Sequence, residues 1–379
     1  MSKKYLISGV SPGPAGVGRV LEYLILNSNN FRFLFPPIGR TRSVKDISNL
    51  LNLNSIFLFF IDFFQFFKKR FIFNLYVNLL NNKEIVILHP QAIGYKNVEK
   101  LILKNKVSIY IMDNSFFCTK SYNYLNTSER ACLLCLNLSY ENAKKNNCTS
   151  FPINYTFEDY FSFLKFLNEN SKRIRFITQN KGQTLLLKQQ FGNDISYNEI
   201  GLLTSDMFGD NKNENESTGK RYDVVFHGDD TLAKGSKYIF EIAKNLPELS
   251  FLFPFNSTLQ EIPKNVDFIK MSWTSGLKDH VVNSKITFCP SLWSAPIEGS
   301  VVKTLNLGVA LGVFDSEYSF SKEIPSDSVL ILTGSLFKDV ELLKEFILSE
   351  EYKKIGINGK IFINEKIQKM TINFENIFK

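Results

Sequence analysis

The sequence lacks any apolar run long enough to cross a membrane. Its most apolar stretch, residues 56–67, contains Asp62 and Gln65, and a basic triplet at 68–70 closes it. A spanning helix needs roughly 20 apolar residues, so this stretch predicts a buried strand and helix. A phenylalanine-rich face resting on a membrane surface is the alternative.

A secretory signal is also missing, because residues 1–4 lead directly into a short strand and not into a long apolar segment. We therefore expect a cytoplasmic protein. A peripheral position at the inner face of the plasma membrane is the second expectation, in keeping with the membrane-surface alternative.

Arginine-rich blocks and RNA-binding signatures are absent as well, so we expect no nucleic-acid partner. The formal net charge of +8 still permits a phosphorylated small molecule or an acidic membrane surface. With 44% hydrophobic and 22% charged residues the chain has a globular composition. Its 379 residues exceed what one ordinary core supports, which predicts two domains.

Strands and helices alternate along the chain, which indicates an α/β fold. Residues 205–221 are mostly polar, rich in Asn, Glu, Lys and Gly, and read as a linker. The predicted organisation is an N-terminal domain over 1–204, a C-terminal domain over 222–360 and a final helix over 361–379.

A glycine-rich turn over 9–19 joins the first predicted strand, Tyr5–Ser8, to a helix that begins at Val20. Glycines in such a turn let backbone N–H groups approach a phosphate. The spacing does not match the dinucleotide-binding fingerprint, and a plain tight turn is about equally compatible with it.

Two turns in the second half carry charged side chains at helix starts. Lys234-Gly235 follows the strand Tyr222–Phe226, and an amine beside free amides suits a diphosphate. A solvated lysine is the alternative, although a cation is unfavourable at that end of a helix.

The second turn begins at Pro290, after the strand Lys285–Cys289, and runs through Trp293 to Glu298 at the start of a helix. Ligands of open α/β sheets lie beyond the carboxyl ends of the strands, where this loop is placed. A surface loop whose glutamate favours the helix dipole is the alternative. The tryptophan and two prolines favour a binding role.

His89 is one of only three histidines, and it follows the predicted buried strand Glu84–Leu88. There it could hydrogen-bond a sugar hydroxyl or a phosphate, or simply its local backbone. Asp113 follows the next strand, Val107–Met112, in the equivalent position.

Four of the five cysteines lie in a turn-rich insert over about 114–150. Cytoplasmic proteins rarely keep disulfides, so this clustering favours a structural tetrahedral zinc site over incidental buried thiols. An iron–sulfur cluster uses the same ligands, but nothing in the sequence indicates redox chemistry. The predicted metal ligands are Cys118, Cys132, Cys135 and Cys148.

The motifs at 226–235 and 290–308 resemble the donor-binding half of retaining GT-B glycosyltransferases of family 4, also called glycosyl transferases group 1. The resemblance implies two Rossmann-like domains facing across a cleft and a C-terminal helix that crosses back to the N-terminal domain. It also implies a nucleotide-sugar donor and no metal in catalysis.

The same resemblance implies residue roles. Lys234 would hold the donor diphosphate, Glu298 would contact the donor sugar, and His89 would lie by the sugar and leaving group; these three form the implied catalytic set. The implied donor-binding set is Gly228, Lys234, Gly235, Ser291, Trp293, Glu298, Gly299, Ser300 and Lys303. The implied acceptor or phosphate loop contains Gly13, Gly16, Gly18 and Arg19.

Three positions depart from the family pattern. Asp229 stands where the family has an arginine, Lys303 stands where it has a second glutamate, and Glu298 lies three positions late. We hypothesise that Lys303 supplies the positive charge lost with the arginine.

The expected function is transfer of a sugar, with retention, from a nucleotide-sugar to a hydroxyl of a glycan or lipid-linked acceptor. Bacterial surface glycan assembly (lipopolysaccharide, capsule or O-antigen) is the expected context. The departures leave open a nucleotide-sugar-binding protein that has lost catalysis. A nicotinamide-dependent dehydrogenase is the third alternative, disfavoured by the absent dinucleotide spacing.

Overall fold

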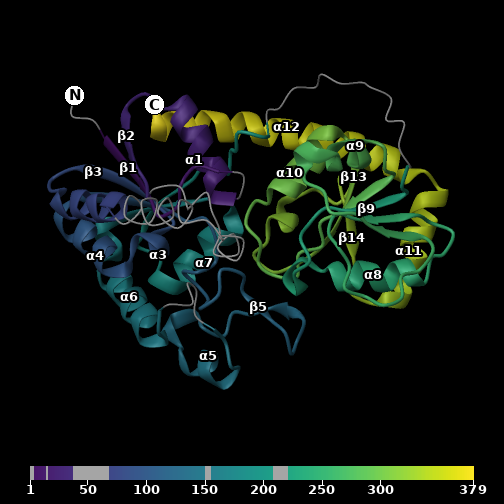
Figure 1. Ribbon diagram of the computed structural model, residues 1–379, viewed down its shortest axis with the longest axis horizontal. Coiled ribbons are helices and arrows are strands. Elements are labelled where there is room, and N and C mark those ends of the chain that lie inside the picture. Colours follow the sequence, from purple (N-terminus) through teal and green to yellow (C-terminus); the bar gives the residue numbers. More distant parts are fainter. Residues whose placement is uncertain (1–3, 14–15, 37–67, 150–154, 208–220) are drawn as a thin grey trace, which may run out of the picture.

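The computed structural model describes residues 4–13, 16–36, 68–149, 155–207 and 221–379. They form two α/β units side by side, each built on a six-stranded parallel sheet (Figure 1). This is the architecture predicted from the sequence. The apolar stretch 56–67, expected to form a buried strand and helix, lies outside the described residues.

The N-terminal unit has the strand order β2-β1-β3-β4-β7-β8. Its strands are β1 (Lys4–Ser8), β2 (Phe31–Leu34), β3 (Glu84–Leu88), β4 (Lys106–Tyr110), β7 (Ile174–Thr178) and β8 (Ser196–Glu199). Its helices are α1 (Gly16–Asn27), a helix seen over 68–79, α3 (Pro90–Ile93), α4 (Tyr95–Lys104), α6 (Phe157–Glu169) and α7 (Lys181–Phe191).

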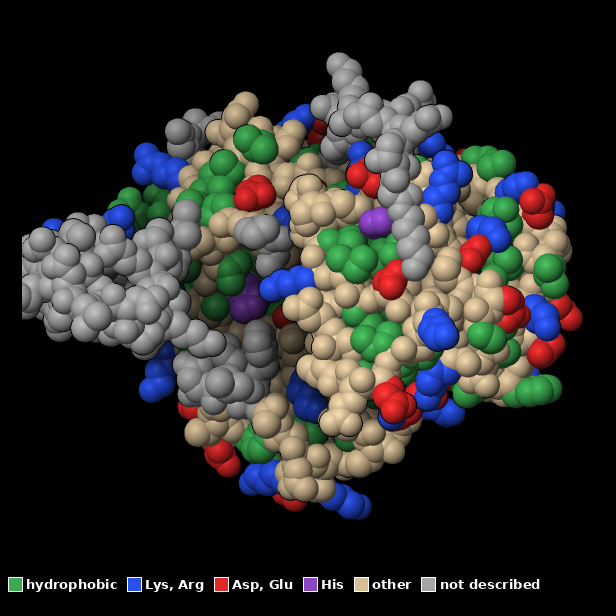
Figure 2. Space-filling view, turned by 45° about the vertical axis from the view of Figure 1, so that its right-hand side comes forward, with side chains coloured by type: hydrophobic (Ala, Val, Ile, Leu, Met, Phe, Trp, Pro, Cys, Tyr) green, Lys and Arg blue, Asp and Glu red, His purple; other side chains and the backbone are tan. Residues whose placement is uncertain are grey.

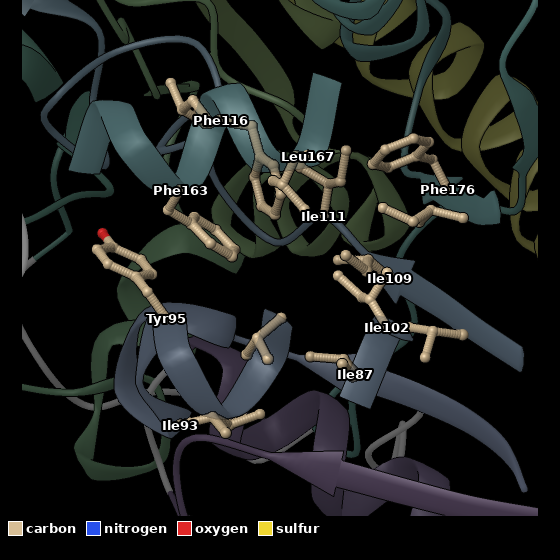
Figure 3. Close-up of a cluster of buried hydrophobic side chains, with 14 of the residues drawn as sticks. Ile87, Ile93, Tyr95, Ile102, Ile109, Ile111, Phe116, Phe163, Leu167 and Phe176 are labelled. Carbon is tan, nitrogen blue, oxygen red and sulfur yellow. The ribbon is translucent and has the colours of Figure 1, made fainter. Parts of the chain in front are cut away.

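The central strands of this sheet are covered on both faces, so they are nearly continuous apolar runs. Ile87, Ile109 and Phe176 are neighbours across β3, β4 and β7, and none is exposed. Figure 3 shows them facing side chains of the covering helices, among them Phe163 and Leu167 of α6. Each such side chain contributes about 1.5–3 kcal/mol by burial.

The C-terminal unit has the order β11-β10-β9-β12-β13-β14, which is the 3-2-1-4-5-6 order of doubly wound nucleotide-binding sheets. Its strands are β9 (Val224–Phe226), β10 (Phe251–Phe253), β11 (Val266–Phe268), β12 (Ile286–Phe288), β13 (Ala310–Phe314) and β14 (Leu330–Leu332). Its helices include α8 (Ser236–Lys244), α9 (Leu277–Val282), α10 (Gly299–Leu307) and α11 (Leu336–Leu348).

The C-terminal helix α12 (Glu351–Phe378) runs from the C-terminal unit back along the N-terminal unit, as predicted (Figure 1). It begins ten residues before the expected start at 361. At its far end Phe374 and Phe378 pack against Phe31 of β2 and Tyr110 of β4. No helix in the described part of the chain is long and apolar enough to cross a membrane.

The cysteine-rich insert leaves the N-terminal sheet after β4 and returns at α6. It contains a small antiparallel hairpin, β5 (Tyr124–Leu125) with β6 (Arg130–Ala131), and a short helix, α5 (Glu141–Lys145). Its two strands have only two residues each, so it has little regular structure of its own.

The packing of α12 gives a stability prediction. Phe374→Ala should lower the free energy of unfolding by about 3–5 kcal/mol, because Phe374 is 3% exposed and lies in the aromatic cluster. Ile372→Ala on the same helix is the matched control, since Ile372 is 59% exposed and should cost less than about 1 kcal/mol. Urea unfolding of both variants measures the difference; equal losses would contradict this account of α12.

Candidate functional site

A cleft of about 830 Å³ separates the two units. Figure 2 shows the hollow between the lobes, with basic side chains at its edge and a histidine inside. Its lining comes largely from segments just after strands of both sheets, where open α/β sheets bind ligands. Charged, imidazole and amide side chains in the lining are Arg19, His89, Asp113, Gln179, His227, Asp229, Asp230, Asn256, Lys234, Lys270, Glu298 and Lys303.

Lys234 and Glu298 come from different strand ends and form an ion pair in this cleft. Lys234 ends a short 3-10 turn after β9, and Glu298 is the N-cap of α10. Ser291 Oγ donates a 2.7 Å hydrogen bond to Glu298 Oε2, so both carboxylate oxygens have partners. The turn after Lys234 fits because Gly235 has φ 74°, and a Cβ there would lie 2.4 Å from the Pro290 carbonyl oxygen.

Burial lowers the pKa of Lys234 to about 8. The adjacent Glu298 carboxylate favours the charged form, so the ammonium stays positive at neutral pH. The rings of Tyr122 and Trp293 lie with centroids 5.2 and 5.4 Å from Lys234 Nζ, within the range of cation–π attraction. Lys234 is therefore a desolvated positive charge at the cleft wall.

A second charged group joins the units. Lys303 of α10 is only 5% exposed and pairs with Asp206, whose Oδ2 also lies 3.0 Å from Arg19 Nη1. Burial lowers the pKa of Lys303 against the opposing effect of Asp206. Burial alone would raise the pKa of Asp206, but hydrogen bonds and charges from Lys303 and Arg19 outweigh it and hold that pKa below its usual value.

His227, just after β9, stacks on Trp273 with ring centroids 5.0 Å apart and planes 2° apart. Burial lowers its pKa to about 3, helped by the positive charges of Lys303, Lys234 and Arg19. The imidazole is therefore neutral near pH 7. It lines the cleft, and its Nδ1 lies 3.4 Å from the Thr304 hydroxyl.

His89 lies on the opposite wall, at the carboxyl end of β3. Its backbone has φ 52° and ψ 63°, a left-handed conformation that is uncommon outside glycine and occurs often at functional sites. Gly9 packs directly beneath it, since a Cβ there would lie 2.3 Å from the His89 carbonyl oxygen. In the glycine-rich turn, Gly16 and Arg19 line the cleft, whereas Gly13 and Gly18 pack on each other.

Most of the residues expected at a donor site share this cleft. The expected residues that line it are Gly16, Arg19, His89, Gly228, Lys234, Trp293, Glu298, Gly299, Ser300 and Lys303. Ser291 and Gly235 do not line it and instead hold Glu298 and the Pro290 loop.

Four residues at or beside the cleft were not predicted from the sequence: Tyr122, Gln179, Asp206 and Trp273. Gln179 follows β7 (Ile174–Thr178), so the strand-end rule that singled out His89 applies to it as well. Asp206 lies in the stretch interpreted as linker, and Tyr122 lies in the insert, where no local pattern marks either one.

The expected zinc site is not supported. Burial raises the pKa of Cys118 to about 12, and the charges of the other three thiols add to this shift. All four cysteines belong to the described residues, yet within the described ranges no set of three or more Cys, His, Asp or Glu is placed to hold a metal ion. The four cysteines are clustered in the sequence, but this clustering does not determine whether their thiols are arranged to bind a metal ion.

A larger cleft of about 930 Å³ lies between the hairpin β5–β6 and the C-terminal unit. Four carboxylates and only two basic side chains line it, which disfavours a diphosphate. These charged residues are Glu129, Glu241, Asp315, Glu317, Arg130 and Lys237. The chemistry expected of the sequence motifs therefore belongs to the smaller cleft.

No family model and no curated protein matches the sequence. Solved structures do match the fold. HepE of Anabaena in complex with UDP and glucose has a TM-score of 0.63 at 9% identity, over 98% of both chains. Sucrose-phosphate synthase of Thermosynechococcus elongatus has a TM-score of 0.63 at 11% identity, over 99% of this chain and 98% of that one.

TarM matches less fully, with a TM-score of 0.52 at 13% identity over 78% of this chain and 54% of that one. Identities this low carry the fold and nothing further. The chain has the GT-B fold, as its two motifs predicted.

The buried imidazole gives a pH prediction. The His227 ring should keep its neutral-form chemical shifts from pH 8 down to about 5 in an NMR titration. The unfolded chain takes up this proton near pH 6.5 and the folded one near 3. The group therefore destabilises the fold as pH falls through that window. A ring that titrates at pH 6 or above would contradict the described burial.

Proposed function

We propose that the protein transfers a sugar, with retention, from a nucleotide-sugar to a hydroxyl acceptor. The observation that carries this proposal is the Lys234–Glu298 ion pair, which lies at the N-terminus of α10 in the cleft of a GT-B fold. HepE, which shares the fold, was solved with UDP-glucose, and that donor is the natural first probe.

The departing nucleoside diphosphate needs positive charge as the bond from the sugar breaks. Lys234 Nζ supplies one cation, and Gly299 and Ser300, whose amides are the first of α10, line the same cleft. Arg19 and Lys303 add two more cations if Asp206 gives up its contacts with them. Stabilisation of a developing anion by fixed donors is usually the largest contribution to such catalysis.

In the proposed retaining transfer, one bond breaks and one forms at the anomeric carbon. The bond between the anomeric carbon and the diphosphate oxygen breaks, and a bond to the acceptor oxygen forms on the same face of the sugar. The acceptor proton passes to the departing diphosphate, so no protein side chain has to act as the base. Glu298 and His89, on opposite walls, would orient the sugar hydroxyls.

For the acceptor, we propose a growing bacterial surface glycan on a lipid carrier. The helix over 68–79 supports peripheral contact with a membrane surface, because Phe71 and Leu79 are 67% and 71% exposed. The described part of this helix contains Lys68, Lys69 and Arg70, and the chain carries a net charge of +8. Exposed apolar side chains beside basic residues suit an anionic bilayer surface.

Two observations favour a binding protein without catalysis as a second candidate. Lys303 is already paired with Asp206, and Asp229 stands where the family pattern has an arginine. Mixing the protein with a panel of nucleotide-sugars and scoring transfer or hydrolysis separates the two functions. Turnover with the donor anomer kept in the product supports retaining transfer. Binding without turnover supports the second candidate, and an inverted product contradicts retention.

The Lys234 role gives a binding prediction. Lys234→Met should weaken UDP binding by about tenfold or more in calorimetry, because one charge-assisted contact to the diphosphate is lost. Lys237→Met is the matched control three residues later, in the first turn of α8, where the side chain is 65% exposed. The control should bind UDP like the parent. Equal affinities for all three proteins would remove Lys234 from the site.

The Glu298 role gives a complementary prediction. Glu298→Gln keeps the size of the side chain and a hydrogen-bonding oxygen but loses the charge. Transfer should fall by about 10²-fold or more while UDP affinity is kept or improved, since Lys234 loses a competing anion. Loss of UDP affinity in parallel with transfer would contradict a sugar-side role.

A further inference from the structure

The cysteine-rich insert of the N-terminal unit packs on both donor-side segments of the C-terminal unit. Tyr124 of the insert forms a buried cluster with Ala233, Trp293 and Ala295, and Tyr122 packs against this cluster. Ala233 directly precedes Lys234, and Ala295 lies three residues before Glu298. The insert therefore contacts the chain one residue before Lys234 and three residues before Glu298.

A buried hydrogen-bond network fixes this contact. Asn123 Oδ1 accepts from the Ser294 backbone N–H at 3.0 Å, and Asn123 Nδ2 donates to Ser294 Oγ at 3.1 Å. Asn114 Nδ2 donates to the Ser294 carbonyl at 2.7 Å and to Asn123 Oδ1 at 2.8 Å. Asn114, Asn123 and Ser294 are at most 1% exposed, so no water replaces a lost partner.

The same insert covers the lysine. The Tyr122 ring lies 4.4 Å from the Trp293 ring at 33°, and both rings flank Lys234 Nζ. Leu292 N–H also donates to the Ala233 carbonyl at 2.8 Å, which ties the two donor-side segments together. Contacts therefore run in a closed circuit from Asn123 through the 292–298 loop to Glu298 and Lys234, and back through Tyr122.

We propose that the insert is a positioning element of the donor site and that Asn123 is its anchor. Asn123 is absent from the cleft lining, so it acts through Ser294 on the loop that carries Glu298. Its side chain sets where the Glu298 carboxylate meets the donor sugar, while Tyr122 holds Lys234 for the diphosphate. The identity of the ligand rests on the function proposed above; the anchoring does not.

The two units have other connections, which makes a local effect testable. The Lys181 backbone N–H donates to Glu323 Oε1 at 2.7 Å, Gln189 Nε2 donates to the Tyr318 hydroxyl at 2.7 Å, and α12 spans both units. Removing the Asn123 side chain should therefore loosen the loop at Trp293 before it separates the units.

The first arm of the test measures the loop without any ligand. In a Trp273→Phe background Trp293 is the sole tryptophan, and it is 3% exposed. Asn123→Ala should raise acrylamide quenching of its fluorescence about twofold or more, because a buried network that excludes water is lost. Asn126→Ala, an exposed asparagine in the hairpin turn, is the matched control and should leave quenching unchanged.

The second arm measures ligands by calorimetry in the otherwise native chain. Asn123→Ala should weaken UDP-glucose binding about tenfold while UDP binding changes less than about threefold, since the sugar side is displaced. Asn123→Asp keeps the acceptor for the Ser294 N–H and should recover part of the UDP-glucose affinity. A purely structural role predicts equal losses for both ligands and no recovery.

The outcomes separate the two proposals. Unchanged quenching in Asn123→Ala overturns the positioning role, whatever the ligands do. Raised quenching with no UDP-glucose binding by the parent protein keeps the anchor and rejects the proposed donor. If Asn123→Ala does not fold, Tyr122→Leu replaces it, because Tyr122 is only half-buried; Trp293 quenching that stays at the parent level then overturns the proposal.

Discussion

The ion pair between Lys234 and Glu298 is the interaction on which the cleft depends. Each charge comes from a segment after a different strand of the C-terminal sheet, and each is largely desolvated, at 17% and 10% exposure. Burying either charge alone would be strongly unfavourable. Because each charge requires the other as its partner, the ion pair holds the two segments at a fixed separation. The Ser291 hydroxyl and the two aromatic rings complete the surroundings of this pair.

Three basic side chains of the cleft pair with carboxylates of the same chain. Glu298 forms an ion pair with Lys234, and Asp206 forms ion pairs with both Lys303 and Arg19. In the proposed function, the diphosphate of a nucleotide-sugar would replace these carboxylates as the partner of the cations. The released carboxylates could then accept hydrogen bonds from sugar hydroxyls. In the proposed reaction, binding energy would thereby be directed to rearranging charge at the reacting centre, where it lowers the barrier.

Strand ends were predictable because buried parallel strands are short apolar runs. Glu84–Leu88 matches β3 residue for residue, which placed His89 at the carboxyl edge of the N-terminal sheet. The expected strand Tyr222–Phe226 contains β9, which placed the motif lysine beyond the C-terminal sheet. The edge strand β8 (Ser196–Glu199) has no apolar run and was missed. Asp206 and Tyr122 lie at the site only because the chain folds back on itself, and no local sequence pattern marks them. The spacing of the cysteines did not predict a metal-binding geometry.

A crystal structure of the protein with UDP-glucose bound tests the central claim most directly. The account predicts an opened ion pair, with Lys234 Nζ about 3 Å from a diphosphate oxygen and the Glu298 carboxylate on a sugar hydroxyl. An intact Lys234–Glu298 pair with the nucleotide bound elsewhere, such as beside the hairpin β5–β6, would contradict it.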